Sequence, residues 1–169
     1  MTVYVQWDRE AHDFRPVASE RTPPQPSAET WWTSTSRTSG DRAAARVTHL
    51  GDRSSAEFRA QVNAQFVEVT GLFEVELPAD LAVLDEIYLE NHGEGAMQAF
   101  GQKLLASDAD AAFYWNEKEA EGGAWSLIVR RDFLGELPSN PGPRVQLISQ
   151  FSASSINREG QGLPQIEWI

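Results

Sequence analysis

The stretch FVEVTGLFEVEL, residues 66–77, has the clearest periodicity in this 169-residue sequence. Apolar side chains occupy one set of alternating positions, and acidic or hydroxyl side chains occupy most of the other set. A period of two predicts a β-strand that buries one face and turns an acidic face outward. Gly71 interrupts the alternation, and the pattern allows either a β-bulge or the turn of a tight hairpin at this position.

The residues that follow this strand favour helices. Apolar side chains recur at helical spacing in residues 79–90 and again in residues 96–107. Pro78 suits the first turn of the first helix, and a four-residue connection at 91–94 joins the two. We therefore expect a helical hairpin here.

Other segments have β-type patterns or a helix-start signal. A capping-box sequence at 54–57 predicts one further helix over about residues 55–64. Strand patterns are present at residues 2–7, 112–116, 123–130, 144–152 and 165–169. The order of elements predicts a single α+β domain with a mostly antiparallel sheet, on one face of which the helical hairpin and the further helix pack.

Residues 8–53 have neither period and few large apolar side chains, and they are rich in Pro, Ser and Thr. We expect this segment to be a long, irregular N-terminal excursion that straps onto a core formed by residues 54–169. Trp31 and Trp32 are the largest apolar side chains of this segment. Adjacent side chains in an extended chain face opposite ways, so at least one Trp should anchor on the body or on another copy of the chain.

Composition excludes several kinds of chemistry. The chain has no cysteine, which excludes disulfides, thiolate metal sites and cysteine nucleophiles. Its three histidines are scattered, so we expect no metal site and no cofactor. No window approaches the ~20 apolar residues of a membrane span. The sequence therefore predicts a cytoplasmic protein that makes no contact with membranes.

The formal net charge is −11 and is concentrated in one part of the chain. Residues 64–121 carry 13 acidic side chains but only two basic ones, Lys103 and Lys118. Phosphate groups repel such a chain, so direct nucleic-acid binding is not expected. Within residues 68–90 no Lys or Arg neutralises the carboxylates. Self-repulsion of this kind costs stability, and two explanations stand side by side: a basic partner, or an ordinary solvated surface that includes adaptation to salt.

The partner-binding residues predicted on this basis are acids of one short segment together with the Trp pair. They are Glu68, Glu74, Glu76, Asp80, Asp85, Glu86, Glu90, Trp31 and Trp32.

A catalytic reading has weaker support. His92 and Glu94 in a Gly-rich turn could share proton transfer, but a linker between helices needs such residues anyway. His12 and His49 have no spacing that links them to each other or to His92. The sequence lacks the Gly-x-Ser-x-Gly, phosphate-loop, dinucleotide-binding and calcium-loop motifs, so no catalytic residue is assigned.

Three functions follow, in this order. The first is a small acidic binding protein that docks onto or neutralises a basic protein, as an inhibitor or immunity protein does. The second is a structural or assembly subunit of a multi-chain particle such as a phage component, with self-association or wrapping through residues 8–52. The third is a motif-poor enzyme that depends on carboxylates brought together in space.

Overall fold

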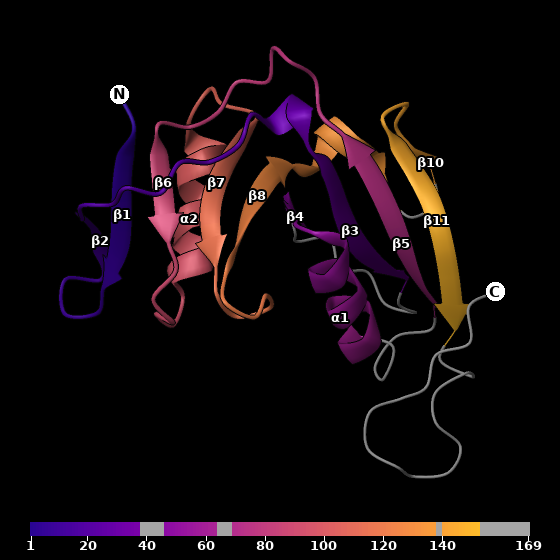
Figure 1. Ribbon diagram of the computed structural model, residues 1–169, viewed down its shortest axis with the longest axis horizontal. Coiled ribbons are helices and arrows are strands. Elements are labelled where there is room, and N and C mark those ends of the chain that lie inside the picture. Colours follow the sequence, from indigo (N-terminus) through magenta and orange to yellow (C-terminus); the bar gives the residue numbers. More distant parts are fainter. Residues whose placement is uncertain (38–45, 64–68, 138–139, 153–169) are drawn as a thin grey trace, which may run out of the picture.

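The computed structural model describes residues 1–37, 46–63, 69–137 and 140–152, and its largest element is a six-stranded mixed sheet with the order β2-β1-β6-β7-β8-β4 (Figure 1). The strands of this first sheet are β1 (Val3–Asp8), β2 (Asp13–Pro16), β4 (Val47–Leu50), β6 (Glu86–Leu89), β7 (Ala111–Asn116) and β8 (Ala124–Arg130). The pairs β1–β6 and β6–β7 are parallel, and the other pairs are antiparallel.

A second sheet has three antiparallel strands in the order β11-β5-β3. Its strands are β3 (Thr30–Arg37), β5 (Val69–Glu76) and β11 (Val145–Ser152). A two-stranded ribbon joins β9 (Gly135–Glu136) to β10 (Asn140–Pro141). The described helices are α1 (Arg53–Asn63), α2 (Ala96–Ala106) and two short 3-10 turns, η1 (Pro26–Ala28) and η2 (Arg131–Leu134).

The two sheets are linked edge to edge, and their side chains share one core. Trp32 on β3 and Gly51, just after β4, exchange two backbone hydrogen bonds of 2.8 and 2.9 Å. Figure 1 accordingly shows the strands as one curved row from β2 to β11. Side chains of both sheets meet in one apolar core, which includes Phe113 and Leu127 from the first sheet and Trp31 and Phe73 from the second.

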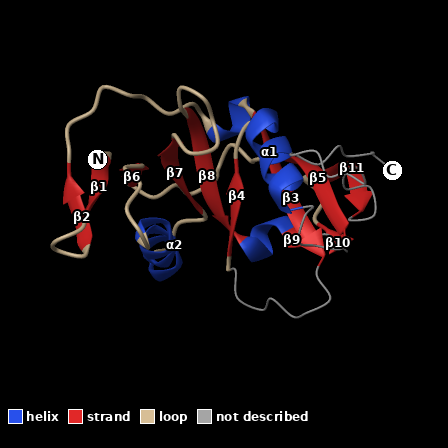
Figure 2. Cartoon of the chain, turned by 90° about the horizontal axis from the view of Figure 1, so that it is seen from below, coloured by secondary structure: helices blue, strands red, loops and turns tan. Residues whose placement is uncertain are grey.

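Each helix covers a different sheet. α2 is the crossover between the parallel strands β6 and β7, and its Phe100 and Leu104 form a second apolar core with Tyr88 and Ile128 of the first sheet. α1 packs against β3 and β5 of the second sheet. Figure 2 shows α2 on one side of the strands of the first sheet. No helix in the described part of the chain is both long and apolar enough to span a membrane.

The expected helical hairpin is wrong, because residues 79–90 are not helical. Residues 78–85 form a connection that turns at residues 79–80, makes an isolated parallel bridge from Val83 to Ala111, and leads into β6. β6 lies in the middle of the sheet, so Ile87 faces one apolar core and Tyr88 faces the other. A strand that is buried on both faces needs consecutive apolar side chains, and such a run can imitate helical spacing.

The expected irregular N-terminal excursion is also wrong. Between residues 8 and 53 the chain forms β2, β3 and β4, and Trp31 and Leu50 from this segment lie in the core. The Thr- and Ser-rich β3 is stabilised by its long pairing with β5, in which Thr33 is buried opposite Phe73. The expected single, mostly antiparallel sheet is wrong as well. The protein has a six-stranded mixed sheet and a three-stranded antiparallel sheet, and the helices α1 and α2 pack on different sheets.

Other expectations are confirmed. β1, α1, β5, α2, the β7–β8 hairpin and β11 lie where the sequence predicts strands, helices and a hairpin. Gly71 is inside β5, paired with Gln150, and is neither a turn nor a bulge; the register shift lies in β11 between Leu147 and Ser149, opposite Phe73 and Leu72. A Cβ at Gly71 would come within 2.8 Å of the Phe73 ring. The predicted strand at 165–169 lies outside the described residues.

Candidate functional site

A polar pocket lies where the parallel strands β6 and β7 end, beside the start of their crossover helix α2. The cavity measures about 280 Å³. Its lining comes from β4, α1, α2, the ends of β6 and β7, and the turn after β7: His49, Arg59, Glu90, Met97, Tyr114, Asn116, Lys118 and Glu119. Ligand sites in open sheets with parallel strands typically lie at the carboxyl ends of those strands.

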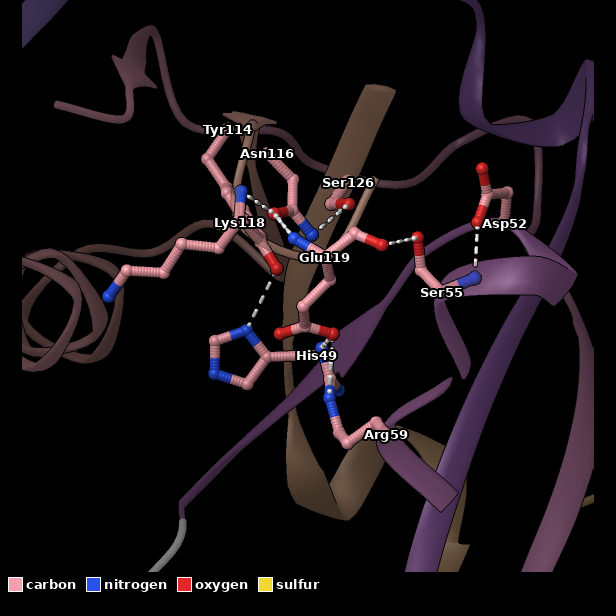
Figure 3. Close-up of polar contacts among 9 residues, drawn as sticks. All are labelled: His49, Asp52, Ser55, Arg59, Tyr114, Asn116, Lys118, Glu119 and Ser126. Carbon is pink, nitrogen blue, oxygen red and sulfur yellow. Dashed lines mark hydrogen bonds and ion pairs between the residues drawn. The ribbon is translucent and has the colours of Figure 1, made fainter. Parts of the chain in front are cut away.

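The pocket wall contains a hydrogen bond between His49 and Tyr114, whose Nδ1 and hydroxyl oxygen are 3.1 Å apart (Figure 3). Burial, reinforced by the nearby Arg59 cation, lowers the pKa of His49 to about 4. Burial also raises the pKa of Tyr114 to about 12. Both side chains are therefore uncharged at neutral pH, and the His49 ring adds no positive charge to the pocket.

A second contact closes one side of the pocket by tying α1 to the turn after β7. Arg59 Nε and Nη2 both donate to Glu119 Oε2, at 3.0 and 2.6 Å. The turn itself is held by Asn116, whose Oδ1 accepts the backbone N–H groups of Lys118 and Glu119, both at 3.1 Å. Ser126 Oγ in turn accepts Asn116 Nδ2 at 3.4 Å. These charges and amides are satisfied inside the protein (Figure 3).

Glu90 and Lys118 form the remaining charged pair of the pocket. Only 6% of the Glu90 side chain is exposed, whereas 59% of the Lys118 side chain is exposed. Lys118 Nζ lies 3.6 Å from Glu90 Oε1, which is longer than a charge-assisted hydrogen bond. The pocket thus holds a buried carboxylate whose partner is a loosely placed, solvent-facing ammonium group.

A second hollow, of about 450 Å³, contains the residues that the sequence singled out for a catalytic reading. It is lined by Trp7, Arg9, His12, His92 and Glu94. His12, His92 and Glu94 are all exposed. Among the described residues, no hydrogen bond or ion pair joins His92 to Glu94, and Arg9 Nη2 donates to the His92 carbonyl oxygen at 3.0 Å. Within the part of the chain that the structure describes, no contact orients a general base in this hollow.

Gly93, in the same turn, has a packing role that we can test. A Cβ at this position would come within 2.4 Å of Trp7 Cδ1. Gly93→Ala must therefore displace the Trp7 ring, which is largely buried in the core under α2. We expect it to lower the free energy of unfolding by about 1–3 kcal/mol, as measured by urea denaturation. Gly95→Ala measures a different cost, because no atom lies near its Cβ position but its φ of 77° is a left-handed conformation that strains alanine.

The structure places the predicted acidic residues in several different environments. Glu76, Asp80 and Asp85 are exposed and follow one another along the end of β5 and the connection to β6. Glu86 pairs with Lys103 at 3.1 Å, and Glu90 lies in the pocket at the other end of β6. Glu74 is half-buried on β5, and Glu68 lies outside the described residues.

The Trp pair is divided between two environments, as its adjacency predicts. Trp31 is 3% exposed in the core between the sheets, which confirms that at least one Trp is anchored on the body. Trp32 faces the other way, half-buried, with the Arg53 guanidinium 4.8 Å from its ring centre. We therefore propose no partner contact for Trp31.

Sequence reasoning missed the pocket, whose lining residues lie between positions 49 and 119. The available signal was the scarcity of lysine. The two lysines of the chain, Lys103 and Lys118, each pair with a carboxylate at one end of β6.

Comparisons with known proteins provide no further assignment. No family model, no curated protein and no solved structure matches this chain.

Proposed function

We propose that the protein is an acidic binding protein that docks onto a basic protein surface, as an inhibitor or immunity protein does. The observation that carries this proposal is the exposure of Glu76, Asp80 and Asp85, which we call the acidic edge. Glu76 and Asp80 have no ion-pair partner among the described residues. Asp85 has the Met1 amine, 3.8 Å away. Such carboxylates can exchange water for a partner's cations.

Further acidic residues lie beside the Asp80–Asp85 end of the acidic edge, whereas exposed Arg144 lies beside Glu76, whose N–H donates to the Arg144 carbonyl at 3.0 Å. The connection that carries Asp80 and Asp85 runs beside the start of β7, where the Ala82 N–H donates to Asp110 Oδ2 at 3.1 Å. Asp108 is exposed two residues before Asp110. The nearby cation Arg130 donates to the carbonyls of residues 104, 105 and 107 at the end of α2, so helix capping uses its hydrogen bonds.

The test is the binding of an oligolysine peptide, as a stand-in for a basic surface, measured by titration calorimetry at low and high salt. We expect the triple variant Glu76→Gln/Asp80→Asn/Asp85→Asn to bind about tenfold more weakly at low salt, since exposed charge pairs contribute about 0.2–1 kcal/mol each. High salt should weaken binding by the parent protein, because exposed charges are screened.

A matched control removes the same charge elsewhere. Glu10→Gln/Glu20→Gln/Glu121→Gln changes three exposed carboxylates on other segments. This control variant should keep most of the parent protein's affinity for oligolysine. An equal loss in both triple variants would show that only net charge matters, and the acidic edge would then not be a docking site.

A further inference from the structure

Glu90 is the fixed charge of the pocket at the carboxyl ends of β6 and β7. It directly follows β6, and its side chain is 6% exposed in a cavity of about 280 Å³. A carboxylate removed from water in this way needs a positive partner or hydrogen-bond donors to offset the lost hydration. The strength of the contact between Glu90 and its partner in the chain therefore indicates whether a ligand could replace that partner.

That partner is loosely held. Among the described residues, Lys118 is the one cation within ion-pair distance of Glu90, and its Nζ is 3.6 Å away. Most of the Lys118 side chain is exposed, so its ammonium group can return to water at little cost. Glu90 cannot do so. The other charged pair, Arg59 with Glu119, is closed by two short hydrogen bonds to one oxygen.

The rest of the lining is uncharged or internally paired. Met97 provides an apolar surface, and Tyr114 and His49 are uncharged at neutral pH. With Lys118 displaced, the unpaired charge in the pocket is negative. Aromatic and thioether surfaces beside a carboxylate suit the methylene groups and the head of an organic cation.

We propose that this pocket binds a small organic ammonium or guanidinium compound, with the Glu90 carboxylate as counter-ion in place of the Lys118 ammonium group. The site is separate from the acidic edge, because Asp85 and Glu90 flank opposite ends of β6. It therefore goes beyond the proposed docking function and is tested with different residues.

Titration with n-butylammonium and with guanidinium, followed by NMR of methyl-labelled methionine, tests the proposal. The chain has two methionines, so the Met97 methyl signal reports on the pocket and that of the fully exposed Met1 is an internal reference. We expect at least one of the two cations to shift the Met97 signal in a saturable way. Butyrate, the matched anion, should leave it unchanged.

Three variants separate this proposal from its alternatives. Glu90→Gln should weaken cation binding by about tenfold or more, since it removes the counter-ion. Lys118→Met should strengthen binding by about two- to fivefold, because it removes an internal competitor for Glu90. Glu121→Gln, which removes an exposed carboxylate outside the pocket lining, is the charge-matched control for Glu90→Gln and should change binding by less than about twofold.

Two results would overturn the proposal. If butyrate shifts Met97 where the cations do not, and Lys118→Met abolishes that shift, the pocket selects anions through Lys118. If no probe shifts Met97 in the parent protein or in Lys118→Met, the Glu90–Lys118 pair is structural only. Neither result bears on oligolysine binding at the acidic edge, which depends on Glu76, Asp80 and Asp85.

Discussion

Trp31→Ala is expected to lower the free energy of unfolding by about 3–5 kcal/mol in urea denaturation, the range for truncating a large buried aromatic side chain. Trp31 lies between the two sheets, 3% exposed, with its ring centre 6.2 Å from that of Phe113. Its Nε1 donates to the Pro26 carbonyl at 2.8 Å, which also fixes the turn before β3. The substitution removes apolar packing and leaves that carbonyl without its donor.

Trp32→Ala is the matched control, because it removes the same side chain from the next position of the same strand. Trp32 is half-buried and packs under the Arg53 guanidinium on the other face of β3. We expect a loss of only about 1–2 kcal/mol there. Equal losses for the two variants would contradict the placement of Trp31 in the core and Trp32 outside it.

Acidification from pH 6.5 to pH 4 is expected to remove up to about 3 kcal/mol of stability through His49 alone. Burial lowers the pKa of His49 to about 4 in the folded protein, against an ordinary value of 6.5. Between these values the unfolded chain binds a proton at His49 and the folded protein does not, so falling pH favours unfolding. The stabilisation is complete above pH 6.5 and is lost as the pH falls toward 4.

Urea denaturation of the parent protein and of His49→Gln across this pH range measures the effect. The variant lacks the titrating ring, so its stability should fall less steeply with decreasing pH. His12→Gln, which removes an exposed histidine, controls for the loss of one imidazole. Parallel pH profiles for the parent and His49→Gln would contradict the burial of a neutral His49 against Tyr114.

The elements that the sequence predicted correctly are those whose signal is local. β5 has an alternating pattern, and β7 and β8 are joined by a short turn that ends in glycine. α1 lies where it was predicted, but its capping box is wrong: Asp52 Oδ1, and not Ser54, accepts the Ser55 N–H at 2.7 Å, and Glu57 pairs with Arg53. Each pattern reports contacts between residues close in the chain, or one buried face of a single element. Local physics is enough to place them.

The prediction for β6 was wrong because the contacts that make this segment a strand are not local. Its neighbours are β1, more than 80 residues earlier, and β7, which is reached through α2. Both of its faces are buried by elements that its own sequence does not specify. β3 failed because its strand pairing with β5 compensates for its low apolar content. In both cases tertiary contacts override the local pattern.

The candidate pocket could not be predicted from the sequence, because its residues meet only through the order of the strands in the sheet. His49 meets Tyr114 across β8, and Glu90 meets Lys118 because two parallel strands end at the same edge. The spacing between these residues in the chain has no meaning until the strand order is known. The acidic composition was visible at once, but its division into an acidic edge and a pocket follows from β6 being a strand.

The most direct test of the proposed function is to map where a basic surface binds. Backbone amide NMR of the labelled protein, titrated with oligolysine at low salt, reports the contact residue by residue. The account predicts that the largest shifts cluster at residues 76–85 and 107–110 and disappear at high salt. Shifts spread evenly over the exposed acidic residues, or centred on the 8–20 segment, would contradict it.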